Sequence, residues 1–324
     1  MRAVLCRSFG PPEALSVEEV PVPRPGPGEV LVRVDAAGVN FADVLMVAGQ
    51  YQARPPFPFV PGLEFAGTVV EAAPDVTEWR AGDHVMGAPP FGAFAEYIAV
   101  GSDRLFPVPA GMPAPAACGF VIAYGTACFA LKHRAGLRPG ETLLVTGAGG
   151  GVGIAAVDVG KRLGARVLAA AGSPEKLAAA EAHGADEGVD CGTQDLRSRV
   201  RELTGGRGFD VLLDTVGGDL FDASLRSTAH FARLLVVGFA GGRIPQVPAD
   251  YLLLKNLSVL GVGFGAIVAM SPASARSVIA ELEAMHSARP FRPELAGEYP
   301  LENAGMALSH LAERKVTGKL AIVP

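Results

Sequence analysis

The sequence of 324 residues has only four cysteines, no cluster of basic residues and no long apolar run. The cysteines are scattered without a Cys-x-x-Cys pair, which argues against a zinc site and is typical of free thiols in a reducing compartment. A formal net charge of −5 without a basic cluster argues against a nucleic acid or an anionic membrane surface as partner. No apolar run reaches the roughly 20 residues of a membrane-spanning helix. We expect a cytoplasmic protein with a small-molecule partner and no bound metal.

Hydrophobic residues make up 49% of the chain, which is enough for roughly two domains at the usual 100 to 200 residues each. The first third carries strand-length runs separated by segments rich in proline and glycine. This texture predicts an irregular, mainly β domain. The expected strands cover residues 30–39, 65–73, 83–87 and 94–100.

From about residue 120 the pattern changes to strands alternating with helices, which predicts a parallel sheet covered on both faces. Six strands can be counted, and this number fits a doubly wound α/β nucleotide-binding sheet. They are expected at 142–148, 166–172, 187–190, 209–217, 232–240 and 257–265. The last sixty residues do not continue this alternation, so we predict that they return to the first domain. The expected domains are 1–122 with 266–324, and 123–265.

The glycine-rich segment VTGAGGGVG covers residues 145 to 153 between a buried strand and the helix expected at 151–164. Glycines at this position let the backbone approach a dinucleotide pyrophosphate, and the helix N-terminus offers amide N–H groups. The spacing is G-x-x-G-x-x-G, not the common G-x-G-x-x-G. A tight turn without a ligand is the alternative interpretation.

The end of the second strand bears on the cofactor. Enzymes that prefer NADH commonly place an acid here to bind the ribose 2′-hydroxyl, whereas residues 166–174 contain none. Ser173 can donate a hydrogen bond and Lys176 supplies a positive charge, which favours the 2′-phosphate of NADPH. Lys176 can equally be an ordinary solvated lysine. Ser173 and Pro174 also predict the start of a helix over 174–185.

Several ordered motifs over the whole chain resemble the medium-chain dehydrogenase/reductase superfamily, and within it the zinc-free quinone oxidoreductases similar to zeta-crystallin. The motifs are AAGVNFADVLMVAGQY (36–51), FVPGLEFAGTVVE (59–71), GDHVMG (82–87), the glycine loop and VTGKLAIVP (316–324). The resemblance implies a GroES-like, mainly β catalytic domain joined to a Rossmann domain with a doubly wound, six-stranded parallel sheet.

Zinc-dependent alcohol dehydrogenases of this superfamily carry a metal-binding cysteine and a His-Glu pair. This chain has Asn40 and Leu63-Glu64 at those positions and lacks the cysteine-rich lobe. A leucine cannot bind zinc, so the usual activation of an alcohol is lost. The resemblance implies instead a direct hydride transfer from NADPH to a quinone or an activated alkene.

The catalytic residues are assigned by motif. Asn40 and Asp43 match the family's Asn-x-x-Asp near the nicotinamide, although Asp43 can instead hold its loop through a structural hydrogen bond. Tyr51 matches a pocket tyrosine whose phenol donates a hydrogen bond or proton to a developing oxyanion. A packing role for Tyr51 is the alternative.

The resemblance also implies a set of residues that contact the cofactor. They are Asn40, Thr126, Gly150, Gly151, Val152, Gly172, Ser173, Lys176, Gly238, Phe239, Gly263, Phe264 and Lys319. One expected contact is missing, because many relatives place a tyrosine on the 2′-phosphate where this chain has Asp190-Cys191. The segment 257–264 resembles an edge strand that pairs with its twin in a second subunit, which implies a homodimer.

These observations lead to one expected function and two alternatives. The expected function is an NADPH-dependent quinone reductase. The first alternative is an enoyl-thioester or enone reductase, in which Tyr51 donates a proton to the α-carbon. The second is a crystallin-like protein that binds NADPH in a structural or regulatory role.

Overall fold

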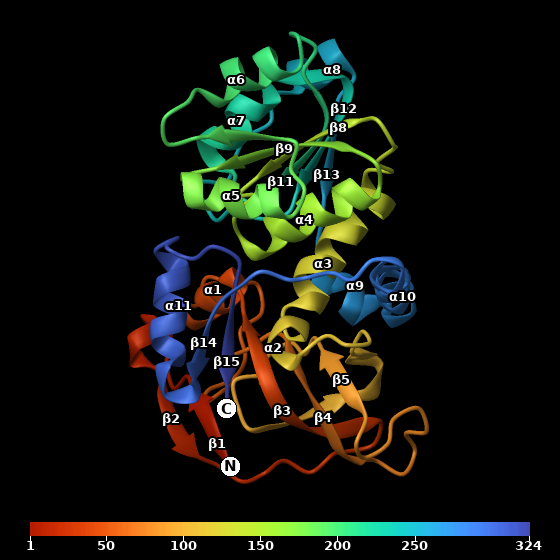
Figure 1. Ribbon diagram of the computed structural model, residues 1–324. Helices are drawn as coiled ribbons and strands as arrows, with labels where there is room; N and C mark the ends of the chain where they lie inside the picture. Colours follow the sequence, from red (N-terminus) through yellow and green to blue (C-terminus); the bar gives the residue numbers. More distant parts are fainter. The chain divides into compact units, whose positions relative to one another are not determined.

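The computed structural model describes residues 1–324 and divides into two compact units (Figure 1). Unit 1 comprises Met1–Ile122 and Gly265–Pro324, and unit 2 comprises Ala123–Phe264. The second boundary lies one residue before the position expected from the sequence. None of the helices combines the length and apolar character that crossing a membrane requires.

Unit 2 contains a six-stranded parallel sheet with the strand order β10-β9-β8-β11-β12-β13. This is the 3-2-1-4-5-6 order of the doubly wound nucleotide-binding fold, so the predicted α/β fold class is confirmed. All five residues of β8 are buried, as expected for a central strand covered on both faces. The strands are β8 (Thr142–Thr146), β9 (Arg166–Ala171), β10 (Glu187–Asp190), β11 (Phe209–Asp214), β12 (Thr228–Val236) and β13 (Ser258–Gly261).

The helices of unit 2 cover both faces of this sheet. Figure 1 shows α4 (Gly151–Arg162) and α5 (Pro174–Ala182) on one face, where they pack on β8, β9 and β10. The opposite face is covered by α6 (Leu196–Leu203), α7 (Gly218–Leu225) and α8 (Ala249–Lys255). The chain enters the unit through α3 (Phe120–Cys128), which continues into a π-helical turn, η3 (Phe129–Arg134).

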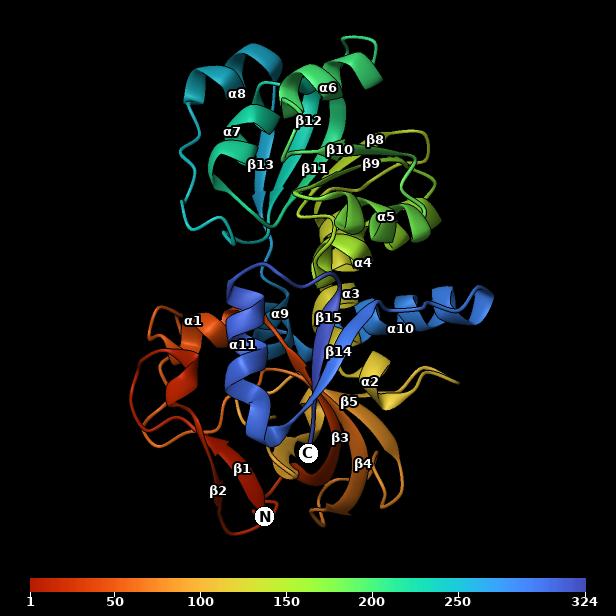
Figure 2. The same ribbon diagram turned by 60° about the vertical axis from the view of Figure 1, so that its left-hand side comes forward.

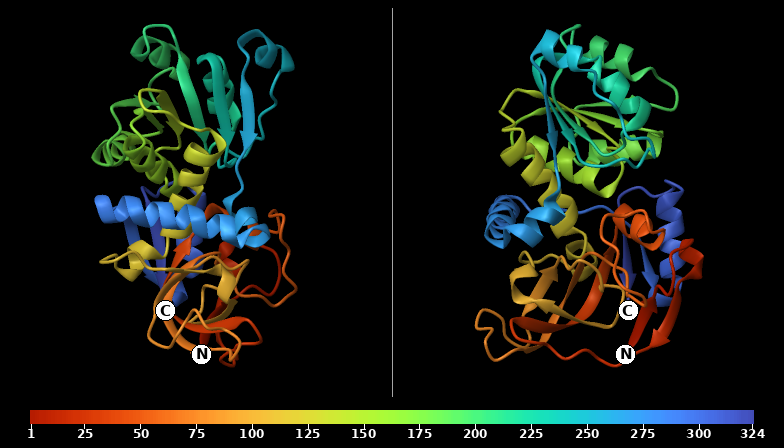
Figure 3. Two further views of the ribbon diagram at one scale, coloured as in Figure 1. Left: turned by 90° about the vertical axis from the view of Figure 1, so that its right-hand side faces the viewer. Right: turned by 180° about the vertical axis from the view of Figure 1, so that it is seen from behind.

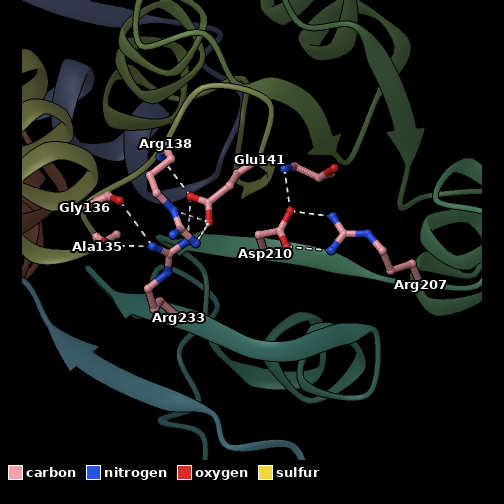
Figure 4. A network of polar contacts seen from close by, with 8 residues as sticks. Ala135, Gly136, Arg138, Glu141, Arg207, Asp210 and Arg233 are labelled. Atoms are coloured by element: carbon pink, nitrogen blue, oxygen red, sulfur yellow. Dashed lines mark hydrogen bonds and ion pairs between the residues drawn. The ribbon is translucent and has the colours of Figure 1, made fainter.

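A network of ion pairs and hydrogen bonds joins strands of unit 2 (Figure 4). Glu141 accepts hydrogen bonds from Arg138 and forms an ion pair with Arg233 of β12 at 2.7 Å. Arg233 also donates to the carbonyl oxygen of Ala135 at 2.8 Å. The carboxylate of Asp210 in β11 accepts the N–H of Thr142, the first residue of β8, at 2.8 Å. These contacts connect β8, β11 and β12 toward the end of the sheet that lies opposite to the glycine loop.

Unit 1 is built around a second, mainly antiparallel sheet of seven strands. Its main path is β14-β15-β3-β4-β5-β7, and β6 pairs with β3. A separate hairpin joins β1 (Arg2–Leu5) and β2 (Ser16–Glu19). The sheet strands are β3 (Glu29–Val39), β4 (Phe65–Ala72), β5 (His84–Gly87), β6 (Tyr97–Gly101), β7 (Leu105–Pro107), β14 (Leu295–Pro300) and β15 (Lys319–Val323).

The C-terminal part of the chain completes this sheet, because β15 lies between β3 and β14. Figure 2 shows α11 (Ala304–Ala312) beside β14 and β15, and α11 also packs on α1 (Phe41–Val47). The longest helix, α10 (Pro272–Ala288), is seen lengthwise in Figure 3 (left). The remaining helices are α2 (Ala114–Ala117), α9 (Phe264–Met270) and the short turns η1 (Pro12–Ala14), η2 (Ser102–Arg104) and η4 (Leu301–Asn303).

Five of the six expected strands of unit 2 extend beyond the observed strands at their C-terminal ends, and two of them differ by four residues. The last strand was expected over 257–265, but β13 ends at Gly261 and Phe264 begins α9. The preceding strand was expected over 232–240, but β12 starts at Thr228 and ends at Val236. Both errors have one cause: in a continuous apolar segment, periodicity alone cannot locate the point where a strand gives way to a loop or helix.

Candidate active site and cofactor cradle

In unit 1, the predicted pair Asn40 and Asp43 lies where β3 ends and α1 begins. Asn40 has an extended backbone and is the N-cap of α1. Its backbone N–H donates to Oδ2 of Asp43 at 2.8 Å, so this carboxyl group closes the first turn of the helix. Asp43 is fully buried, and its Oδ1 has no hydrogen-bond partner. The structural role considered for Asp43 is therefore present in the structure, with one polar atom unused.

Burial raises the pKa of Asp43 to about 7, and the nearby Glu64 carboxylate acts in the same direction. The backbone N–H of Asn40, the charge of Lys319 and the backbone N–H of Gly62 oppose this shift. An uncharged carboxyl group is the favoured form when a buried oxygen lacks a donor. Asp43 therefore carries its proton in slightly acidic solution, where an exposed aspartate has lost it.

Glu64, which the sequence analysis did not select as a site residue, connects the other groups of this site. It is fully buried directly before β4. Its Oε1 accepts the side-chain amide of Asn40 at 2.9 Å and forms an ion pair with Lys319, and its Oε2 accepts the N–H of Ile122 at 3.0 Å. A buried carboxylate is tolerated when paired and hydrogen-bonded in this way. The signal in the sequence was an acid inside the apolar segment FVPGLEFAG.

Lys319, the first residue of β15, is the cation of the site. Its Nζ donates to Oδ1 of Asn40 at 2.6 Å and contacts Glu64. The lysine stem lies against Gly119, where an added methyl group would come within 2.8 Å of the Lys319 Cγ. A methyl group at Gly38 would likewise lie 2.7 Å from Oε1 of Glu64. Two glycines therefore leave room for the ion pair, and the paired side chains hold both ends of the Asn40 amide.

Tyr51 lies half-buried beyond the end of α1, and its backbone N–H donates to the carbonyl oxygen of Leu45 at 3.1 Å. Burial raises the pKa of the Tyr51 phenol, and the carboxyl group of Asp43 adds to this shift. A phenol with a raised pKa remains protonated at neutral pH. Tyr51 can therefore act as a hydrogen-bond or proton donor.

In unit 2, the glycine loop follows β8 and leads into α4. Gly147 has a φ of +68°, and Gly150 is the N-cap of α4 without a side-chain hydrogen bond. A methyl group at Gly153 would overlap the carbonyl oxygen of Gly147 and lie 2.8 Å from the Cα of Ala148. The helix thus starts directly against the turn, with the first amides of Gly151 and Val152 at its N-terminus, as a pyrophosphate cradle requires.

Asp214 at the end of β11 binds residues next to this loop. It accepts the hydroxyl of Thr146 and the N–H of Gly217, the latter at 2.9 Å. The hydroxyl of Thr215 donates to the carbonyl oxygen of Thr146 at 3.0 Å. These bonds fix the ends of β8 and β11, so the position of the glycine loop is set by the strand ends below it.

The predicted 2′-phosphate residues lie after β9. Ser173 is the N-cap of α5 and accepts the N–H of Lys176 at 3.4 Å, which confirms the predicted helix start. The side chain of Lys176 covers Gly149, where an added methyl group would lie 2.5 Å from the lysine Cβ. Gly172 is exposed. Of the predicted 2′-phosphate residues, the structure therefore brings Lys176 against the glycine loop.

The remaining predicted cofactor residues of unit 2 lie in loops or helices. Gly238 and Phe239 are in the loop after β12, and Gly263 is exposed between β13 and α9. Phe264 is 2% exposed, and its ring lies against Gly125, where a methyl group would come within 2.9 Å of it. Thr126 follows in α3 and is also buried. A packing role accounts for the contacts of Phe264.

Known protein families match segments in both units of the chain. The chain matches the family models "Alcohol dehydrogenase GroES-like domain" over residues 26–110 and "Zinc-binding dehydrogenase" over residues 151–283. It is 43% identical to quinone oxidoreductase-like protein 2 of Bos taurus, covering 99% of this chain and 92% of that protein. It is 33% identical to a quinone oxidoreductase of Pseudomonas aeruginosa, covering 98% of each.

Solved structures of proteins complexed with NADPH have a similar fold over the whole chain. A mycobacterial protein complexed with NADPH has a TM-score of 0.93 and 32% identity, with all of both chains covered. The Escherichia coli quinone oxidoreductase complexed with NADPH has a TM-score of 0.92 and 26% identity, again over both whole chains. The fold and both family models define an oxidoreductase of the medium-chain dehydrogenase/reductase superfamily. Within it, the chain belongs to the quinone oxidoreductase branch.

Proposed function

We propose that this oxidoreductase transfers hydride directly from NADPH to a quinone, without a metal ion. The observation that carries the proposal is the Glu64–Lys319 ion pair, in which an ammonium group is the partner of the buried carboxylate. Asn40 is held by the same pair. The donor set suits neither zinc nor another Lewis acid, because its amide and carboxylate already bind a lysine and Leu63 has no ligand atom.

NADPH is the cofactor, and the glycine loop fits its pyrophosphate, because Gly153 lets α4 begin directly against the turn and Gly150 at its N-cap has open space, with no atom closer than 3.6 Å to an added methyl group. When bound, NADPH supplies the hydride. Gly151 and Val152 would offer backbone amides to the pyrophosphate, and Lys176 would meet the 2′-phosphate.

In this proposal Tyr51 keeps its proton at neutral pH and donates a hydrogen bond to the oxyanion that develops on the reduced acceptor. Asn40 is oriented by Glu64 and Lys319, both of which hold its side chain. A quinone needs little further activation, because the negative charge is delocalised over its ring. The protonated hydroquinone then forms with a proton from solvent or from Tyr51.

The second candidate function is reduction of an enoyl thioester or enone. It is favoured by the same neutral phenol, which can protonate an α-carbon after hydride addition. A crystallin-like role, with tight NADPH binding and negligible turnover, is the third. The three differ in which electrophiles are turned over.

The test is steady-state oxidation of NADPH with 1,4-benzoquinone, 9,10-phenanthrenequinone and crotonyl thioesters. Turnover of quinones but not of the thioester is the expected result. Turnover of the thioester alone would favour the second function. Tight NADPH binding without turnover of any acceptor would favour the third.

We also propose a homodimer formed through the edge of the unit 2 sheet. The expected edge segment 257–264 is shorter in the structure, where β13 covers Ser258–Gly261 at the end of the strand order. Leu253 and Leu254 on the preceding helix are 79% and 71% exposed. An unpaired edge beside exposed leucines favours a second copy as its partner. Sedimentation analysis of Leu253→Glu, expected to be monomeric, tests the proposal.

A further inference from the structure

The loops after β9 and β10 lie side by side in unit 2. Asp190, the last residue of β10, pairs with Ala171, the last residue of β9. The N–H of Cys191 then donates to the carbonyl oxygen of Ala171 at 2.8 Å. A methyl group at Gly192 would lie 3.3 Å from the carbonyl oxygen of Gly172. The second loop therefore borders the residues that would face the 2′-position of the cofactor.

The Ser173 hydroxyl interacts with both Lys176 and Glu175. It accepts the N–H of Lys176 at 3.4 Å, and its interaction with Glu175 lowers the pKa of that carboxyl group. Glu175 is exposed in the first turn of α5 and therefore carries a negative charge at neutral pH.

Two carboxylates stand here beside one lysine. The Asp190 carboxylate accepts the N–H of Gly192 through Oδ1 and the hydroxyl of Thr193 through Oδ2, both at 2.9 Å. The negative charge of Asp190 acts to raise the pKa of the Glu175 carboxyl group, against the effect of Ser173. The segments 172–176 and 190–193 contain two acids and only Lys176 as a base. Residues 166–174 contain no acid, but the folded region at the ends of β9 and β10 does contain two carboxylates, those of Glu175 and Asp190.

We propose that Glu175 and Asp190 set the cofactor selectivity of this protein by opposing the 2′-phosphate of NADPH and offering acceptors to the ribose 2′-hydroxyl of NADH. The inference rests on the proposed function, because it assumes that a dinucleotide binds at the glycine loop. Each negative charge near a dianionic phosphate weakens its binding, and added salt screens the effect. The wild-type protein therefore binds NADPH with only a small preference over NADH.

Calorimetric titration of the full chain with NADPH and with NADH tests this. In Glu175→Gln and Asp190→Asn the ratio of the two affinities is expected to shift toward NADPH by about fivefold each, with a smaller shift at high salt. Glu175 is exposed, so its substitution leaves the fold intact. Glu202→Gln is the matched control, because it removes one charge from the last turn of α6, where Glu202 pairs with Arg199. It is expected to leave the ratio unchanged.

An unchanged ratio in both variants, with both dinucleotides still bound, would overturn the selectivity proposal and leave the proposed function standing. A shift equal to that of Glu202→Gln would do the same, since the effect would then reflect net charge alone. If neither NADPH nor NADH binds to the folded wild-type protein, the proposed function is overturned, and the selectivity proposal with it.

Discussion

The carboxylate of Glu64 and the ammonium group of Lys319 form a buried ion pair across 255 positions of sequence. Glu64 is fully buried and the side chain of Lys319 is 11% exposed. Breaking such a pair leaves one charge buried without compensation, which is more costly than removing both. Loss of either partner is therefore expected to destabilise unit 1, and the pair orients the side chain of Asn40.

Lys319→Met is expected to lower the free energy of unfolding by about 3 kcal/mol, because it leaves the Glu64 charge buried and unpaired. The double variant Lys319→Met with Glu64→Gln is expected to recover at least ~1 kcal/mol of this loss. Urea unfolding measures both. Glu18→Gln is the control, since its pair with Arg7 is exposed to solvent and contributes little to stability. Equal losses in the single and double variants would contradict this account.

Asp43 predicts a pH dependence of stability. Its pKa of about 7 in the folded state lies above the usual value, so between about pH 4 and 7 the folded state binds the extra proton. Stability from this group is therefore present at low pH and is lost as the pH rises toward 7. Relative to Asp43→Asn, the wild type is expected to lose up to about 1.4 kcal/mol per pH unit in this range. Parallel urea midpoints of the two proteins from pH 5 to 8 would contradict the prediction.

Tyr51→Phe is expected to lower turnover about 100-fold with acceptors that need a proton donor, and to leave NADPH affinity within about twofold. The charge of Asp43 acts on the Tyr51 phenol, and Tyr51 is not among the residues expected to contact the cofactor. Tyr299→Phe is the control, since its hydroxyl bonds His310 at 2.8 Å. Comparable losses in the two variants would show that Tyr51 acts through packing.

Gly153→Ala and Gly150→Ala separate the structural and binding roles of the glycine loop. A methyl group at Gly153 overlaps the Gly147 carbonyl, so we expect a loss of about 1 to 3 kcal/mol in stability even without NADPH. At Gly150 the nearest atom to an added methyl is 3.6 Å away. Thermal unfolding of Gly150→Ala is therefore expected to match wild type, while calorimetry shows weaker NADPH binding. Equal melting temperatures of the two variants would contradict this distinction.

Sequence patterns predicted the six-stranded sheet, because buried parallel strands and capped helices leave strong local signals. The Ser173-Pro174 cap is an example. Patterns failed at Phe264, where one apolar run serves a strand, a turn and a helix. They also missed Glu64, whose role depends on Lys319 and Ile122, both far away in sequence. The effect of Ser173 and Asp190 on the pKa of Glu175 depends on the positions of the side chains, which composition does not reveal.

The position of unit 2 between Glu64 and Lys319 has a consequence for biosynthesis. A chain made from its N-terminus presents Asn40 and Glu64 first, then all of unit 2, and only afterwards β15 with its lysine. Domains fold as units during synthesis, so unit 2 can acquire its native structure while Glu64 still has no counter-ion. The nascent first segment must keep that carboxylate hydrated until Lys319 is synthesised, so the seven-stranded sheet of unit 1 is the last part to be completed.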